Sequence, residues 1–163
     1  MLLVLAISVS SCGVYSFSGA NLSPDIKTIS IQNFENSSGE GPANLTQIVT
    51  ENFKQFYLRN STLNLARQDG DLQLEGRITG FTVSPAAIQR VDGIDQAAQN
   101  RLTITIQVNY VNNKDPKQNF NQTFSAFEDF PQDQNLTQLP QSFIDRIVER
   151  IISDVFNRTV ANW

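Results

Sequence analysis

The clearest pattern of hydrophobic and polar residues lies in the segment RLTITIQVNY, residues 101–110. Leucine, isoleucine, valine and tyrosine alternate there with threonine, glutamine and asparagine. A period of two residues predicts a β-strand with one apolar and one polar face. The loop NNKDP that follows is typical of a hairpin, so residues 120–127 are expected to return as its partner strand.

Two earlier segments also alternate. The alternation predicts one strand over residues 26–34, IKTISIQNF, and another over residues 71–83, DLQLEGRITGFTV. In the second segment, Leu72, Leu74 and Ile78 occupy even-numbered positions, whereas Phe81 and Val83 occupy odd-numbered positions. Because Gly80 lies at the switch, a β-bulge there would keep all five apolar side chains on one face.

Helical periodicity occurs twice. Apolar residues recur at helical spacing between Pro42 and Tyr57, and again from Pro140 to about Val160. A proline near the start of each segment suits the first turn of a helix. The second stripe runs through Phe143, Ile147 and Ile151, with charged residues opposite.

The predicted order is therefore β-α-β-β-β-α. We expect an α+β fold of two layers, in which a mostly antiparallel four-stranded sheet carries both helices on one face. The other face, rich in threonine, glutamine and asparagine, would remain polar. Residues 84–100 have no clear period and are expected to form a long connection.

The N-terminal residues predict a lipid anchor. The apolar run LLVLAISV is as long as the core of a signal peptide and too short to span a bilayer. The following VSSC resembles the bacterial lipobox, which predicts that Cys12 is acylated and tethers the chain to a membrane. Gly13 is not the aspartate of the enterobacterial inner-membrane retention pattern, so the outer membrane is favoured. A buried strand with a free cysteine is the alternative.

These segments divide the chain into three parts. Residues 1–11 are expected to be a lipoprotein signal peptide, residues 12–25 a lipidated tether, and residues 26–163 a single α+β domain.

Composition narrows the chemistry. The net charge is −4 and no block of lysine or arginine occurs, which argues against nucleic acid as a partner. There is no histidine and only one cysteine, so the commonest general base and thiolate metal sites are excluded. The carboxylate pairs Asp69/Asp71, Asp92/Asp95 and Glu128/Asp129 fall in predicted loops, where solvated surface is their ordinary role. We expect no catalytic site, no cofactor and no bound metal.

Several of these residues carry a family resemblance. The lipidated opening CGVYSFSG, the strand ISIQNFEN, an aromatic-rich first helix, the strand LTITIQVNY and the closing apolar helix are together similar to the lipopolysaccharide-assembly lipoprotein family LptE. The resemblance implies an outer-membrane lipoprotein lodged in the large β-barrel LptD. There it would act as a plug, assist barrel assembly and help deliver lipopolysaccharide to the outer leaflet. Only the role of Cys12 transfers by motif.

Two questions stay open at this level. ISIQNFENSSG also resembles the first strand of periplasmic α/β lipoproteins of the curli-secretion-channel and penicillin-binding-protein-activator families, which are binding or pore-forming modules. In addition, a chain of net charge −4 cannot attract anionic lipopolysaccharide through its overall field. Direct contact would need local cations such as Arg77, Arg90 or Arg101, each of which could instead be solvated surface.

Overall fold

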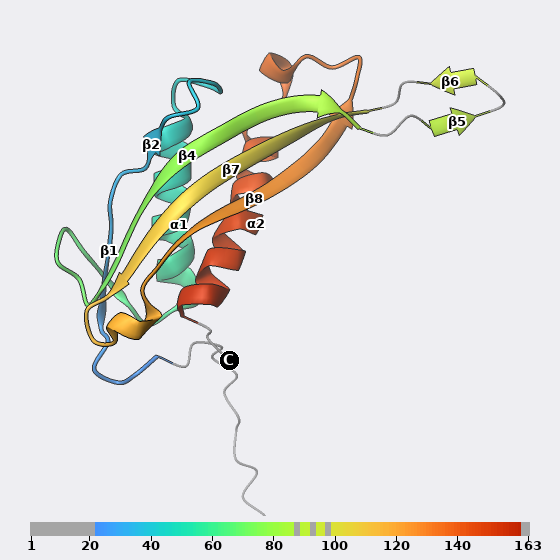
Figure 1. Cartoon of the computed structure of the whole chain (residues 1–163). Helices are drawn as coiled ribbons and strands as arrows, with labels where there is room; N and C mark the ends of the chain where they lie inside the picture. Colours follow the sequence, from blue (N-terminus) through green and yellow to red (C-terminus); the bar gives the residue numbers. More distant parts are fainter. Residues whose placement is uncertain (1–21, 87–88, 92–93, 97–98, 161–163) are drawn as a thin grey trace, which may run out of the picture.

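A computed structural model of the chain describes residues 22–86, 89–91, 94–96 and 99–160, and within them the fold is α+β (Figure 1). Its two α-helices are α1 (Leu45–Asn60) and α2 (Gln141–Thr159). The strands are β1 (Thr28–Ile31), β2 (Glu35–Asn36), β3 (Asn64–Ala66), β4 (Leu72–Pro85), β5 (Gln89–Val91), β6 (Ile94–Gln96), β7 (Gln99–Asn112) and β8 (Phe120–Pro131). Two short 3₁₀ helices are η1 (Pro116–Gln118) and η2 (Leu136–Gln138).

Six strands form one mixed sheet. The order is β3-β1-β4-β7-β8, and β2 pairs with β4 beyond the end of β1. β4, β7 and β8 are long antiparallel neighbours, as the alternation predicts, whereas β1, β2 and β3 pair in parallel. The prediction of a mostly antiparallel four-stranded sheet was therefore wrong in strand number, and the parallel pairs of β1, β2 and β3 make the sheet mixed. β2 and β3 span only two and three residues, too few to produce a recognisable period.

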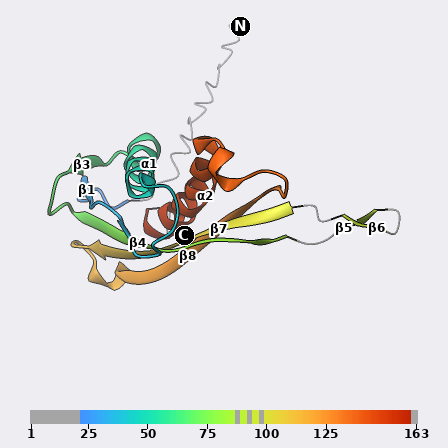
Figure 2. The same ribbon diagram turned by 90° about the horizontal axis from the view of Figure 1, so that it is seen from above.

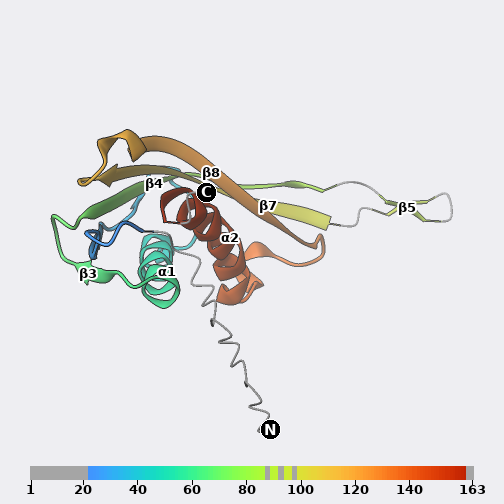
Figure 3. The same cartoon turned by 90° about the horizontal axis from the view of Figure 1, so that it is seen from below.

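Both helices lie on the same side of the sheet (Figures 2 and 3). The apolar stripe of α2 is buried, and α1 packs beside it, with the Phe56 and Tyr57 rings against the Phe156 ring. The core forms where these stripes meet the apolar residues of β4 and β7. At the far end of the helix pair, the Tyr57 hydroxyl lies 2.7 Å from the Thr159 hydroxyl, which ties α1 to α2. The two-layer arrangement is as predicted.

The bulge in β4 lies where the apolar residues switch from even to odd positions in the sequence. The pairing of β4 with β7 shifts register between Ile78 and Gly80, so Ile78 and Phe81 both face the helices and are buried. Val83 was predicted to be buried as well, and this is wrong. Its side chain is 45 % exposed because it lies on β4 at the rim of a cleft beside the first turns of α1 and α2.

The segment predicted as a long connection is mostly strand. β4 continues to Pro85 and β7 begins at Gln99, so the two strands form a ribbon that extends past the helices (Figure 1). β5 and β6 pair antiparallel as a separate hairpin beyond it. The alternation is weak in this region because a ribbon without a covering layer has no face to bury.

Several chain segments meet at the opposite end of the sandwich, shown at the bottom of Figure 1. We call this the entry end; it comprises residues 22–28, 57–60, 70–71, 112–119 and 156–160. Residues 1–21, including the predicted signal peptide and Cys12, lie outside the described residues.

Candidate functional site

The sheet face turned away from the helices is the first candidate surface. We call it the open face. The register of β4, β7 and β8 places on it every second residue of these strands. Its main members are Gln73, Glu75, Arg77, Thr82, Ser84, Arg101, Thr103, Thr105, Gln107, Asn109, Asn121, Thr123, Ser125, Phe127 and Asp129. The surface is therefore dominated by hydroxyl and amide groups, as the alternation predicts.

Arg101 is bound in place on the open face. Its guanidinium donates two hydrogen bonds to the Asp129 carboxylate, at 2.7 and 2.9 Å, from the neighbouring strand. The guanidinium also lies over the Phe127 ring, 3.7 Å from its centroid. The hydrogen bonds from Arg101 hold the pKa of Asp129 below its usual range. This pairing covers part of Phe127, an otherwise exposed aromatic side chain.

The other charges of the open face are also compensated. Arg77 lies 3.4 Å from the Glu35 carboxylate of β2. Glu75 accepts a hydrogen bond of 2.7 Å from the Asn109 amide. Of the residues named above as the open face, two are arginines and two are carboxylates, so the surface is polar but has no net charge.

A polar hollow of about 470 Å³ lies on this surface beside β2. Amide side chains line most of it, including Gln32, Gln107, Asn109 and Asn121. Its charged lining residues are Glu35, Glu75 and Arg77. Such a lining can exchange hydrogen bonds with hydroxyl, amide or backbone groups of a docked molecule.

The predicted lipopolysaccharide contacts are not brought together. Arg77 and Arg101 share the open face, but Arg101 pairs with Ser84, seven positions along β4 from Arg77. At about 3.3 Å per residue they are roughly 20 Å apart. Arg90 lies in β5, and its side chain falls outside the described residues. Arg77 and Arg101 are therefore too far apart to bind one anion together.

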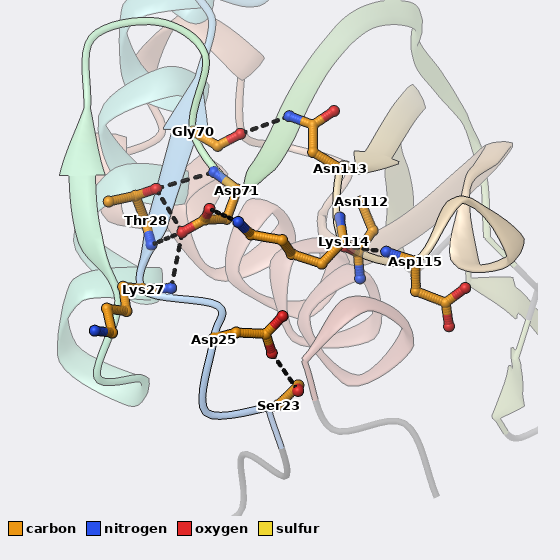
Figure 4. Close-up of polar contacts among 10 residues, drawn as sticks. All are labelled: Ser23, Asp25, Lys27, Thr28, Gly70, Asp71, Asn112, Asn113, Lys114 and Asp115. Atoms are coloured by element: carbon orange, nitrogen blue, oxygen red, sulfur yellow. Dashed lines mark hydrogen bonds and ion pairs between the residues drawn. The ribbon is translucent and has the colours of Figure 1, made fainter.

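A second polar centre lies at the entry end, around Asp71 (Figure 4). Its carboxylate accepts hydrogen bonds from the backbone amides of Lys27 and Thr28, at 2.9 and 3.0 Å, and from the Thr28 hydroxyl at 2.9 Å. The Lys114 ammonium lies 3.1 Å away. These contacts, the Lys27 amide foremost, hold the pKa of Asp71 well below its usual range. Asp71 thus fastens the incoming chain to the β3–β4 and β7–β8 connections.

Besides Asp71, two further carboxylates that were expected to be solvated loop residues are structural. Glu128 and Asp129 lie in β8, and each pairs with arginine. Glu128 faces the helices and bonds both Arg146 and Arg150 of α2, at 2.6 and 3.0 Å. Sequence reasoning missed this because the partners are about twenty residues away along the chain, and only the fold brings them together.

An apolar cleft of about 700 Å³ lies between the first turns of α1 and α2 and the β4 strand. Its lining includes Ile48, Phe81, Val83, Leu136, Leu139 and Ile144. Periodicity alone does not indicate it, since η2 supplies part of the wall.

Within the described ranges there is no group of three or more aspartate, glutamate, cysteine or histidine residues placed to hold a metal ion. No helix in those ranges is both long and apolar enough to cross a membrane.

Comparisons with known proteins address the fold and the family. The family model described as LptE, lipopolysaccharide-assembly, matches residues 26–159. A search of curated proteins finds no match. The fold resembles the hypothetical protein CT253 from Chlamydia trachomatis, with a TM-score of 0.57 and 9% identity over 83% of this chain and 99% of that one.

Two further solved structures share the fold. Protein XCC0632 from Xanthomonas campestris has a TM-score of 0.56 and 10% identity, and the alignment covers 85% of this chain and 88% of that one. A minor lipoprotein from Acinetobacter baumannii has a TM-score of 0.52 and 13% identity, with 84% and 94% covered. At these identities the likeness establishes the fold alone.

Proposed function

The chain belongs to the LptE family of lipopolysaccharide-assembly proteins, and from that membership we propose that it is an outer-membrane lipoprotein serving as plug and assembly partner of a large β-barrel. Acylated Cys12 would anchor it to the membrane. The barrel partner would be LptD-like, inserting lipopolysaccharide into the outer leaflet, and the domain would lie within its lumen or on its periplasmic side.

The observation that carries this proposal is the open face. The lumen of a large outer-membrane barrel is polar and wet, so a plug needs a surface that accepts hydrogen bonds without a strong field of one sign. Hydroxyl and amide groups from three adjacent strands provide such a surface, and its two arginines are offset by two carboxylates. We propose that the open face lies against the barrel wall.

The protein would act by filling the lumen of the barrel, without catalysing a reaction. The chain has no histidine. The two buried phenols, Tyr57 and Tyr110, have raised pKa values because burial disfavours their ionised forms, so both stay neutral and structural. Contact with lipopolysaccharide phosphates would use exposed arginines that can exchange partners. Arg77 suits this role, because its pair with Glu35 is solvent-exposed and exposed pairs contribute little to stability.

The test is a detergent extraction of the lipidated protein from its own cells, followed by identification of stoichiometric partners. We expect a single barrel polypeptide in equal amount. Depletion of the protein should also remove the heat-resistant, gel-shifted form of that barrel and lower surface lipopolysaccharide. The Cys12→Ser variant is the matched control, since it lacks the acylated residue but retains the whole domain.

Other partners would contradict the proposal. Recovery of a peptidoglycan synthase, or of a ring of identical copies, would point to the activator or secretion-channel families. Normal barrel assembly in depleted cells would exclude the plug role even if the two proteins copurify.

A further inference from the structure

Positive charge gathers at the entry end. Five exposed cations come from four separate segments there: Lys27, Arg59, Lys114, Lys117 and Arg158. The carboxylates of the same end are Asp25, Asp71 and Asp115. The whole chain has 12 basic and 16 acidic residues, so the remainder holds seven basic against thirteen acidic. A chain of net charge −4 thus concentrates a net positive charge at one end.

The carboxylates of this end are already engaged within the protein. Asp71 binds two backbone amides and Lys114, and Asp115 accepts the Lys117 amide at the start of η1. Asp25 accepts a hydrogen bond from the Ser23 hydroxyl. Among the described residues, Lys114 is the only one of the five cations with an ion pair. The other four ammonium and guanidinium groups can therefore face an external anion.

Internal bonds hold these segments together as one surface. The Tyr57 hydroxyl joins the last turn of α1 to that of α2, and the Tyr110 hydroxyl donates to the Thr159 carbonyl at 3.4 Å. The Asn64 amide donates to the Lys27 carbonyl, next to the end of α1. The Arg158 guanidinium lies 5.6 Å from the Phe120 ring centroid, beside the start of β8. The cations therefore form a rim around the point where the chain enters the domain.

An exposed leucine accompanies the rim. Leu58, in the last turn of α1, is 48% exposed. Cations combined with exposed aliphatic side chains are what a protein needs to rest on an anionic bilayer. The cations meet the headgroups, and the leucine buries area in the interface.

We propose that the entry end is a docking surface for a bilayer containing anionic phospholipid. The position of the chain supports this occupant, because Leu22 lies at this end and is only ten positions along the chain from Cys12. Ten residue-to-residue steps span at most about 35 Å, so an anchor at Cys12 would keep the rim near the headgroups. A basic surface would add an electrostatic attachment to that of the lipid. The proposal uses the anchoring part of the proposed function and is independent of the barrel.

The test uses the full chain carrying Cys12→Ser, so that no acyl group contributes. Binding is measured by co-sedimentation with vesicles of phosphatidylcholine alone and of phosphatidylcholine mixed with phosphatidylglycerol. The rim variant is Arg59→Gln/Lys117→Gln/Arg158→Gln. The matched control, Lys54→Gln/Arg67→Gln/Arg146→Gln, removes three cations elsewhere. Circular dichroism confirms that each variant is folded.

We expect the rim variant to lose affinity for the anionic vesicles by about fivefold per cation, roughly a hundredfold in total. Added salt should weaken wild-type binding to them, and the control variant should bind like wild type. Binding to phosphatidylcholine alone should be the same for all three proteins. Leu58→Ser should weaken binding to both vesicle types several-fold.

Equal losses in the rim and control variants would overturn the proposal, as would equal wild-type binding to the two vesicle types. Stronger binding to vesicles in which lipopolysaccharide replaces phosphatidylglycerol would assign the rim to the glycolipid instead. A failed barrel pull-down would leave vesicle binding unchanged, so the two proposals fail separately.

Discussion

The two faces of the same sheet differ in almost every physical respect. Towards the helices, β7 presents Leu102, Ile104, Ile106, Val108 and Tyr110, all buried. Towards the open side, the intervening residues are Thr103, Thr105, Gln107 and Asn109, all partly exposed. Neighbours in sequence thus have opposite tasks: one set excludes water, and the other offers hydrogen bonds.

This difference indicates where substitutions should matter for stability and where for binding. Burial of the helix-covered face supplies most of the free energy that holds the domain together. The open face contributes little to that sum, because its groups exchange hydrogen bonds with water in the unfolded chain as well. Its composition is therefore free to suit a partner.

A charge introduced on each face should separate these roles most strongly. Ile151 of α2 is fully buried against the sheet, so Ile151→Asp places a carboxylate in the core. We expect a loss of more than about 4 kcal/mol in the free energy of unfolding, enough to unfold most domains of this size. The milder Ile151→Ala should cost about 2–5 kcal/mol. Thermal melting followed by circular dichroism measures both.

Thr123→Asp on the open face is the control for that experiment. Its side chain is exposed, and the variant should melt within about 0.5 kcal/mol of wild type. An Ile151→Asp protein that melts like wild type but fails to bind its partner would mean that the α2 stripe faces a partner.

Two glycines of β4 allow a finer comparison. A Cβ on Gly76, which faces the helices, would lie 2.2 Å from the Phe34 ring, and that ring is stacked on Phe53. A Cβ on Gly80, at the bulge on the open side, would meet only Thr105, whose Cβ and Oγ1 atoms would lie 3.2 Å away. We expect Gly76→Ala to cost about 1–3 kcal/mol through overpacking, measured by urea denaturation.

Gly80→Ala should cost clearly less, because its contact with Thr105 is a full ångström longer than that of Gly76 with Phe34 and needs a shift of only a few tenths of an ångström. Equal losses for the two alanine variants would show that the faces are equally constrained, contrary to the comparison above.

The same contrast explains how far the sequence could be interpreted. A strand with one buried face alternates, so β7, the bulge in β4 and both helices were predictable from spacing. The parallel pairing of β1 with β4 leaves no such trace, since it depends on which backbone edges are free. On the open face, the Arg101–Asp129 pair joins residues 28 apart. Arg77 and Arg101 could be named as exposed cations, but their separation required the structure.

A smaller effect is expected from the Arg101–Asp129 pair on the open face. Because Arg101 lowers the pKa of Asp129 in the folded state, the pair stabilises the fold above the ordinary aspartate pKa of about 4. That contribution is lost as the pH falls through the lowered pKa. Arg101→Gln should therefore be less stable than wild type at neutral pH, and the difference should shrink in acid.

Urea denaturation of both proteins at neutral pH and below about pH 3 measures this. A difference that does not change with pH would assign the role of Arg101 to its contact with the Phe127 ring rather than to the carboxylate.

The central claim, that the open face lies against a barrel wall, is tested most directly by photo-crosslinking in the native membrane. A photoreactive residue is placed at Thr123 on the open face, or at Gln55 and Glu149 on the exposed sides of α1 and α2. We predict that Thr123 crosslinks to one large barrel polypeptide in high yield and that the helix positions give much less. Crosslinking to the barrel from Gln55 and Glu149, with none from Thr123, would contradict the account.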